Sequence, residues 1–545
     1  YETHPNYEEH AFEPIIFTLA GNFPFVSQKI DFQVKFRGFY INFNSYNGAS
    51  PLKETNNSET RTKTFSFTDT DREKLEDTRF LFKYLVEPTI KFQVIYSSPK
   101  FKKTSKNFLG EIGVPKSQIT VNELKEYVNR VEMANKEAVD YFVNTNCISL
   151  LRKYRKKDIS KRRFLQDAYK YLQVTTLLDD GYDNLNYSIN DVYFVGILKN
   201  LLDQKDIKNK IVVAIRRSTG NIENLLLTEE LIWLLKVNIG KSVYYIFTPD
   251  MYSSIDDRYS SAEGAEAYAI ISDKNPRNTK ISKFNLPASS FTENTVSKSY
   301  EVSLTDMSIM DIESTTSAKG ISKYDYFSSA LIYDDYVPAK LKEFDIKEFP
   351  LTKNKGKLEE QKRKIKDRIA EDEKERKETF ESLREQTFTL KSYDDFELLN
   401  NGLGKKNDSL TFLERFSVED LIKKAGPNYL LEVGKFIGNQ MELKEKEMVR
   451  TKDIWIGFAA TYSYEISFNV PEGYQLQGID KLSMTVENET GGFLSTAELE
   501  GNILKVRTRK FYKNIFEPKE NWDKMVEFIE AAYDFTQVKL LMKKG

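Results

Sequence analysis

Nucleophilic catalysis needs a nucleophile with a base beside it, and this sequence holds few candidates for either role. Cys147 is the only cysteine, and His4 and His10 are the only histidines. A cysteine or serine nucleophile usually gives its proton to an imidazole within hydrogen-bond reach. Both histidines lie at the extreme N-terminus, ahead of every element expected to form a catalytic core. The sequence therefore predicts no Cys, His, Asp triad and no zinc site of Cys and His ligands.

Paired carboxylates are a second source of chemistry, because a hydrolase can use one as a general acid and the other as a base. Catalysis requires a fixed separation between the two groups, and adjacent aspartates are more often turn or cap residues. A carboxylate-dependent hydrolase acting on a glycan or peptide therefore stays as the alternative hypothesis. Its candidates are three aspartate pairs near tyrosines: Asp179–Asp180 with Tyr182, Asp256–Asp257 with Tyr259, and Asp334–Asp335 with Tyr336.

The segment 183–250 contains the elements that would have to position such groups. After a turn at Asp183–Asn186, apolar residues recur at spacings of three and four over Asn190–Leu202, which predicts an amphipathic helix. Three β-branched, aromatic or aliphatic runs follow, separated by turn-like breaks. The pattern predicts a buried helix followed by an antiparallel sheet with strands at Ile211–Ile215, Leu231–Val237 and Val243–Phe247.

This order of elements resembles the papain-like core of the transglutaminase-like superfamily. In that family a cysteine begins the helix, a histidine lies on the next long strand, and an aspartate follows on the strand after it. The resemblance places Asp191 at the nucleophile position, Ile232 near the histidine position, and Thr248 or Asp250 near the aspartate position. Two of the three chemical roles are therefore missing. Asp191 is also well explained as a residue that begins a helix, favoured there by the helix dipole.

The flanking segments extend the resemblance to one group of Gram-negative envelope proteins. Before the core, apolar and polar residues alternate over Ile30–Phe36 and Phe39–Phe43, after the motif Glu9–Pro14. After the core, the segment 453–544 is again rich in predicted strands. It contains the turn Val470–Tyr474 and the step Gly491–Phe493. These segments resemble the β-domains of unknown function that precede and follow the transglutaminase-like core in that group.

Outside the segment 183–250, two stretches carry dense charge and one stretch lacks a clear pattern. Lys355–Glu385 has a thin apolar seam that includes Phe380 and Leu383, which predicts a charged helix lying along a domain surface. A docking arm for another protein is the alternative for that helix. The basic cluster Arg152–Lys157 could contact an anion, although a solvated helix end explains it as well. Phe284–Glu301 is expected to be a loop.

Composition narrows the class of protein. The chain has 545 residues, with 81 Lys and Arg against 82 Asp and Glu, so its net charge of -1 argues against a broad nucleic-acid surface. No apolar run approaches the roughly 18 residues that span a bilayer, and no signal peptide is evident. The expected fold is a multidomain α+β chain with an antiparallel β-sandwich, a transglutaminase-like core and a C-terminal β-sandwich. We expect boundaries at 1–115, 116–340, 341–400 for the charged helical connector, and 401–545.

The resemblance implies an architecture and an envelope setting more than a reaction. We expect a non-catalytic scaffold or binding protein that acts as a subunit of a complex, with envelope or outer-membrane proteins as partners. The expected location is periplasmic or otherwise extracytoplasmic, and any lipid anchor would lie in a segment outside this sequence. No cofactor, metal or nucleic-acid partner is expected. A thiol enzyme centred on Cys147 is a third hypothesis, and it would need a base from another chain.

Overall fold

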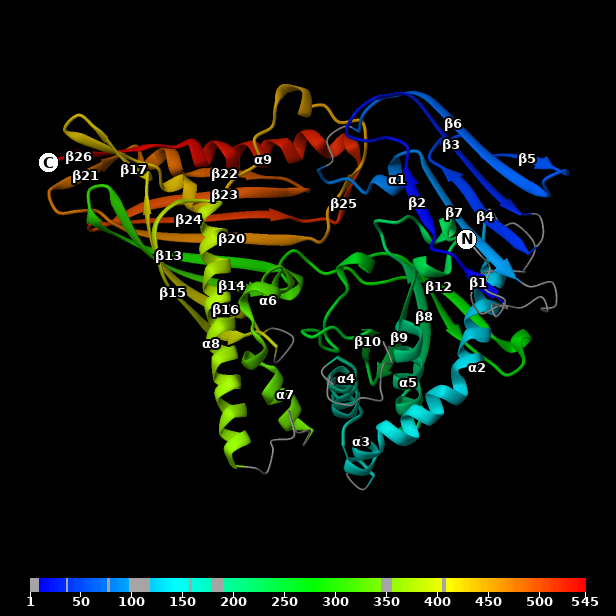
Figure 1. Cartoon of the computed structure of the whole chain (residues 1–545). Coiled ribbons are helices and arrows are strands. Elements are labelled where there is room, and N and C mark those ends of the chain that lie inside the picture. Colours follow the sequence, from blue (N-terminus) through cyan, green and yellow to red (C-terminus); the bar gives the residue numbers. More distant parts are fainter. Residues whose placement is uncertain are drawn as a thin grey trace. The chain divides into compact units, whose positions relative to one another are not determined.

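The computed structural model describes residues 9–35, 38–75, 79–97, 118–155, 159–177, 190–344, 355–403 and 408–545. Its chain contacts divide it into two compact units (Figure 1). The first unit comprises residues 1–176, 185–250 and 258–288, and the second comprises residues 177–184, 251–257 and 289–545. Both units combine helices with mainly antiparallel sheets, so the expected α+β class is confirmed.

The first unit begins with two antiparallel sheets that share one apolar core. Phe32 of β3 stacks on Phe65 of β6 and on Phe92 of β7, with ring centroids 5.1 and 4.8 Å apart, so side chains from both sheets meet there. A short helix, α1 (Lys83–Val86), precedes β7. One sheet holds β1 (Glu9–Ala11), β2 (Ile15–Thr18), β4 (Phe39–Tyr46) and β7 (Thr89–Ser97); the other holds β3 (Phe25–Lys35), β5 (Lys53–Asn57) and β6 (Thr62–Arg72).

Four helices and a five-stranded sheet complete the first unit. The helices are α2 (Val121–Asn146), α3 (Ile148–Lys153), α4 (Lys161–Leu177) and α5 (Asp191–Asp203). The sheet has the order β10-β9-β8-β11-β12, and every neighbouring pair is antiparallel. Its strands are β8 (Asn209–Ile215), β9 (Leu231–Ile239), β10 (Ser242–Phe247), β11 (Glu266–Ile271) and β12 (Lys280–Asn285). The predicted helix followed by three strands is therefore confirmed.

Close packing fixes α5 against α2. The Asn190 side chain accepts a hydrogen bond from the Tyr193 backbone N–H and caps α5. Gly196 faces α2 so closely that a Cβ atom there would lie 2.9 Å from Val139 Cγ2. A larger residue would therefore push the two helices apart.

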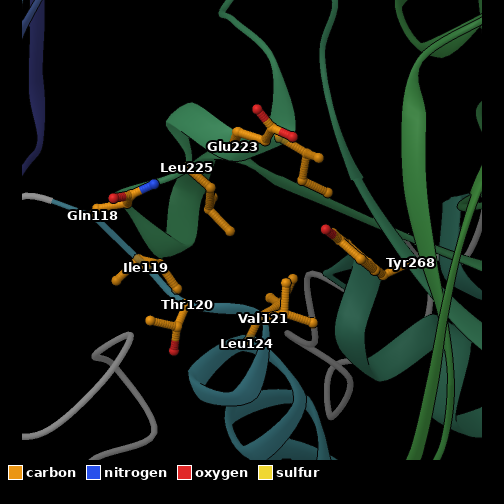
Figure 2. A pocket seen from close by; sticks show the side chains of 9 residues that line it. Gln118, Ile119, Thr120, Val121, Leu124, Glu223, Leu225 and Tyr268 are labelled. Atoms are coloured by element: carbon orange, nitrogen blue, oxygen red, sulfur yellow. The ribbon is translucent and has the colours of Figure 1, made fainter.

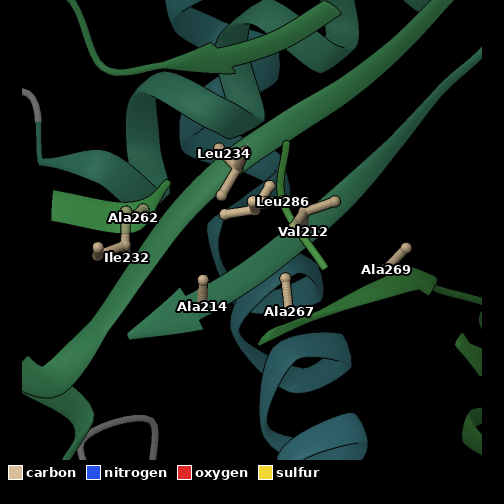
Figure 3. Packing of buried hydrophobic residues seen from close by; sticks show 8 residues of the cluster. All are labelled: Val212, Ala214, Ile232, Leu234, Ala262, Ala267, Ala269 and Leu286. Carbon is tan, nitrogen blue, oxygen red and sulfur yellow. The ribbon is translucent and has the colours of Figure 1, made fainter. Parts of the chain in front are cut away.

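The two faces of the five-stranded sheet carry different buried side chains. Ile232 and Leu234 of β9 point to the same face as Val212 and Ala214 of β8, where small apolar residues interlock (Figure 3). Trp233 points to the opposite face, because neighbours along a strand alternate, and its ring lies 6.3 Å from that of Tyr127 in α2. The face that carries Trp233 is thus the one in contact with α2.

An eight-stranded sheet forms the centre of the second unit, in the order β15-β16-β14-β13-β20-β24-β23-β22. Of the strand pairs that the structure describes, β13 with β20 is parallel and the others are antiparallel. The strands are β13 (Thr295–Asp306), β14 (Ile309–Lys319), β15 (Thr389–Asn401), β16 (Leu410–Glu419), β20 (Ala460–Asn469), β22 (Met484–Glu487), β23 (Gly491–Glu500) and β24 (Ile503–Tyr512). The strands β13 and β14, which lie in the predicted core at 116–340, thus pair directly with β20 and β16 of the predicted C-terminal domain at 401–545.

The described part of the second unit also holds two smaller sheets and four helices. One smaller sheet has the order β17 (Ile422–Ala425), β18 (Asn428–Leu431), β26 (Leu540–Lys544) and β21 (Tyr474–Gln477), and the other pairs β19 (Ile454–Trp455) with β25 (Phe516–Glu517). Helix α9 lies against β22 and β23 (Figure 1). The helices are α6 (Tyr324–Ala330), α7 (Val337–Glu343), α8 (Lys355–Glu385) and α9 (Trp522–Gln537).

The expected loop at Phe284–Glu301 is wrong over its second half, because β13 begins at Thr295. Val296, Lys298, Tyr300 and Val302 alternate onto one face of β13, in the manner of a strand. A lysine in the second of these four positions breaks the apolar pattern from which strands are recognised. The strand is set by its pairing with β14 and β20 rather than by its own composition.

Helix α8 has the predicted bounds, but its contact face differs at one residue. Phe380 is fully buried, with its ring centroid 4.6 Å from that of Phe396 and 5.0 Å from that of Phe412. Leu383, expected in the apolar seam, is 38% exposed, while the neighbouring Arg384 is buried. The ion pair of Arg384 with Glu414 of β16 explains the difference. A charged side chain can be buried between a helix and a sheet when an oppositely charged partner is buried beside it.

Candidate functional site

The thiol of Cys147 lies at the junction where α2 ends and α3 begins, and it is fully buried. Burial raises its pKa to about 12, because an apolar environment disfavours the thiolate. His10 lies on β1 with its ring 4.7 Å from that of Phe12, whereas His4 lies outside the described residues. The Cys147 thiol is therefore protonated at neutral pH and has the properties of a core residue.

The three positions inferred from the family resemblance belong to separate elements. Asp191 is the first residue of α5, Ile232 is buried within β9, and Thr248 directly follows β10. Ile232 faces the apolar cluster on the side of the sheet away from Trp233. In the described part of the chain, no hydrogen bond joins the Asp191 and Thr248 side chains, and Thr248 Oγ1 has no hydrogen-bond partner. These positions hold no connected set of polar groups.

The aspartate pairs have different surroundings. Asp334 binds Arg368 of α8 at 2.9 Å, and Asp335 binds Arg376 of α8 at 2.7 Å. Asp335 also accepts a hydrogen bond from the Ile332 backbone N–H. Both groups thus anchor α8, which gives them a structural task. The pair Asp179–Asp180 and the predicted turn at 183–186 lie outside the described residues.

Asp257 is the buried member of the second aspartate pair. Burial raises its pKa, while the charge of Lys323 and hydrogen bonds from Ser254 oppose the rise. Its carboxylate accepts the Ser254 backbone N–H at 2.7 Å and the Tyr324 hydroxyl at 3.2 Å. The carboxyl group is therefore well ordered and held by donors from two segments of the second unit.

A pocket of about 300 Å³ lies within the first unit, beside the start of α2 (Figure 2). Its walls combine apolar and polar groups in similar measure: Leu124 and Leu225 are almost fully buried, and Tyr268 presents its ring. Ligand sites typically combine apolar walls with a few polar groups that fix the orientation of the ligand. The lining consists of Gln118, Ile119, Thr120, Val121, Leu124, Ile222, Glu223, Leu225 and Tyr268.

The polar groups of the pocket suit recognition better than catalysis. Thr120 caps α2 through a capping box with Glu123, so its hydroxyl already has a structural role. Glu223 is 69% exposed at its side chain and pairs with Lys283 at 3.2 Å. Gln118 and Tyr268 add an amide and a phenol. The lining thus offers hydrogen bonds and one carboxylate at the rim, and its hydroxyl–carboxylate contact, Thr120 with Glu123, belongs to the capping box of α2.

A buried ion pair fixes one wall of this pocket. Lys91 of β7 binds Glu230 at 2.5 Å, and both side chains are 2% exposed. Lys91 also donates to the Asn224 carbonyl at 3.2 Å, while Glu230 accepts the backbone N–H groups of Leu226 and Leu227, each at 3.0 Å. The segment that carries Ile222 and Leu225 is therefore tied to the N-terminal sheet.

The sequence did not identify this pocket. Its lining comes from three separate segments, and none of them contains a recognisable motif. The one signal within reach was Thr120 followed by Glu123, which marks the start of a helix rather than a site. Neither a cluster of three or more metal-ligating side chains nor a helix fit to cross a membrane occurs among the described residues.

Comparison with known proteins identifies one segment of the chain. Residues 429–542 match DUF3858, a family of domains of unknown function with a solved structure. This match confirms the expectation of a C-terminal domain of unknown function. A solved structure from Parabacteroides distasonis, described as a candidate protease, resembles the chain at 10% sequence identity and a TM-score of 0.43, over 99% of this chain and 76% of that one. None of the curated proteins matches this sequence.

Proposed function

We propose that this protein is a non-catalytic binding protein of the cell envelope, built on a transglutaminase-like core that has lost its triad. The proposal rests chiefly on the pocket beside α2, whose lining combines apolar and polar groups suited to recognition. The burial of Cys147 supports the same conclusion, because a thiol with a pKa near 12 is a poor nucleophile at neutral pH.

The finer architecture belongs to the same proposal. The helix α5 followed by β8, β9 and β10 has the order of a papain-like core, with sandwich-type β-domains before and after it. The match of residues 429–542 to a domain of unknown function is consistent with the C-terminal part of this scheme. The envelope setting and the role as a complex subunit derive from the family resemblance.

The pocket would receive an apolar side chain from a partner protein. Its volume of about 300 Å³ is at the small end of ligand sites, and the apolar part of its lining, which includes Leu124 and Leu225, suits an aliphatic or aromatic group. The Glu223 carboxylate and the Gln118 amide at the rim could then hydrogen-bond the backbone of the partner.

Site-specific photocrosslinking in the native envelope tests this proposal. We would replace the rim residue Glu223 by p-benzoylphenylalanine and use Glu498, whose side chain is 55% exposed in the second unit, as the matched control. We expect one discrete protein adduct from position 223 and none from position 498. A Gln118→Arg substitution at the rim should reduce that adduct. Equal or absent adducts at both positions would contradict a partner at the pocket.

A carboxylate-dependent hydrolase is the second candidate, and Asp257 is the observation that favours it. A general acid needs a raised pKa, and burial gives Asp257 one. Its neighbour Asp256 would have to act as the base. Turnover of a glycan or peptide that the Asp257→Asn substitution abolishes would support this candidate. Absence of turnover across a panel of glycans and peptides would leave the binding role as the remaining candidate.

A further inference from the structure

Four polar side chains form one continuous row across the central sheet of the second unit. The strand register places Thr316 of β14 opposite Lys298 of β13, Lys298 opposite Tyr464 of β20, and Tyr464 opposite Thr508 of β24. Residues directly opposite one another share a face of the sheet, and neighbouring strands lie about 4.8 Å apart. The four residues, which we name the polar row, thus span roughly 14 Å on one face.

The polar row has no hydrogen-bond partners among the residues that the structure describes. Thr316 and Thr508 are 0% and 4% exposed, and the hydroxyl of each is buried without a partner. Lys298 and Tyr464 are half-buried, and no described residue hydrogen-bonds to either side chain. Buried polar groups are normally satisfied, so the two buried hydroxyls, those of Thr316 and Thr508, need an explanation outside this part of the protein.

The charge of Lys298 is uncompensated, although a carboxylate lies nearby. Glu414 is fully engaged: Arg384 donates two hydrogen bonds to it, each 2.8 Å long, and the Tyr393 hydroxyl donates a third at 3.1 Å. Lys510 of β24 lies opposite Tyr462 on the same face of the sheet, one row away from the polar row. Its ammonium group donates to the side chain of Gln440, which is neutral. Two lysines and one arginine therefore share this region with two carboxylates, those of Glu414 and Asp325, and Glu414 is already paired with Arg384.

Electrostatics agree with this geometry. Burial lowers the pKa of Lys298 to about 8, the charge of Arg384 lowers it as well, and Glu414 opposes the shift. Burial alone lowers the pKa of Lys510 to about 8. A cation that is held in such surroundings without a partner gains from a bound anion, because the anion would restore the lost solvation.

Tyrosine rings border the polar row and would shape its ligand. Tyr300 lies next to Lys298 on the same face of β13, and Tyr462 precedes Tyr464 on the same face of β20. Tyr326 of α6 lies near enough to Tyr464 and Tyr462 for their charges to raise its pKa further. Phenol rings exclude water from one side of a ligand and offer hydroxyl donors at their tips.

We propose that the polar row binds a compact oxyanion at Lys298, with the Lys298 ammonium as its ion-pair partner and the hydroxyls of Thr316 and Tyr464, one strand to either side, as hydrogen-bond donors. An oxyanion fits because Lys298 supplies one cation between two hydroxyls, and the nearby Glu414 carboxylate is already paired. The anion would be a carboxylate of a small organic acid or a phosphate. This site lies within the second unit and is separate from the pocket and from the proposed binding function.

Thermal shift and calorimetry with defined anions test the site. The probes are phosphate, acetate and benzoate at millimolar concentration, with chloride at equal ionic strength as the reference. We expect saturable binding and a rise in Tm for at least one probe. Preference for benzoate or acetate would assign an organic acid, and preference for phosphate would assign a phosphoryl group. Saturation by none of the three would overturn the proposal and leave solvent as the partner of the row.

The matched variants are Lys298→Met and Lys319→Met, which make the same change at a half-buried and at an exposed lysine of adjacent strands. We expect Lys298→Met to weaken anion binding about tenfold or more, because a charge-assisted hydrogen bond is lost, and Lys319→Met to leave it unchanged. Equal affinity in both variants would refute the assignment of Lys298.

A titration by NMR of reductively methylated lysines supplies a readout that does not depend on affinity. Anion binding should raise the pKa of Lys298 from about 8 and leave that of Lys319 in place. The groups that share this environment are Arg384 of α8, Glu414 of β16, Asp325 and Tyr326 of α6, Lys510 of β24, and the tyrosines Tyr300, Tyr462 and Tyr464. A Lys298 titration that saturating anion does not move would contradict the proposal.

Discussion

Two lysines, Lys91 of the first unit and Lys298 of the second, have opposite surroundings. In the first unit, Lys91 and Glu230 lie in the core with each other and with backbone groups as partners. In the second unit, Lys298 is held on a sheet face with hydroxyls that also lack partners in the described residues. A satisfied buried pair joins parts of a fold, whereas an unsatisfied group points to something that the chain binds. Burial alone thus does not distinguish a structural charge from a functional one.

Breaking the satisfied pair should have the largest effect. Glu230→Ala leaves the Lys91 ammonium buried without its carboxylate, and we expect a loss of about 3–5 kcal/mol in the free energy of unfolding. Denaturant unfolding of the full chain, read at Trp233, would measure it. The double variant Lys91→Met with Glu230→Leu should recover most of the loss, since apolar residues of similar size can replace a buried pair. A single-variant loss below about 1 kcal/mol would contradict a structural role.

Two cations of the second unit should then respond differently to the same change. Arg384→Met leaves Glu414 buried and unpaired, so we expect a loss of about 3 kcal/mol. Lys298→Met removes a cation that has no partner among the described residues, so we expect stability in anion-free buffer to change by less than about 1 kcal/mol or to increase. Chemical denaturation of both variants decides the point. Similar losses would mean that Lys298 is also a structural residue.

The pH dependence of stability should separate Lys298 from the other lysines. Its pKa is about 8 in the folded protein and near the ordinary lysine value of 10.5 in the unfolded chain. Between these values the unfolded chain holds the proton that the folded protein has released, so stability rises with pH in this window. The difference in unfolding free energy between wild type and Lys298→Met should shift in favour of wild type from pH 8 to pH 10. A constant difference would contradict the lowered pKa.

The smallest effect concerns the contact between α2 and α5. Gly196→Ala places a methyl group against Val139, and we expect a loss of about 1–2 kcal/mol. Val139→Ala in the same chain should relieve the clash, so the double variant should lose less than the sum of the two single variants. Additive losses would mean that the helices move apart freely at this point.

Sequence patterns predicted the regular elements well and the sites poorly. The helix at Asn190–Leu202, the three strands after it and the bounds of α8 follow from the periodicity of apolar residues, which is a local property. The strand β13 was missed because Lys298 interrupts its apolar face, and Arg384 takes the buried position next to the one predicted for Leu383. Both residues are explained by neighbours that are distant in sequence. The pocket beside α2 is lined by three segments that are distant in sequence, so no local pattern could predict it.

The reactivity of Cys147 tests the central claim, the absence of a working nucleophile, most directly. The measurement is the rate of alkylation by iodoacetamide in the folded protein as a function of pH, with the denatured chain as reference. We predict that the folded thiol reacts far more slowly than the denatured one at pH 7, and that its rate keeps rising with pH beyond pH 10, as a pKa near 12 requires. Rapid labelling of the folded protein at neutral pH would contradict the account and restore the thiol enzyme as a hypothesis.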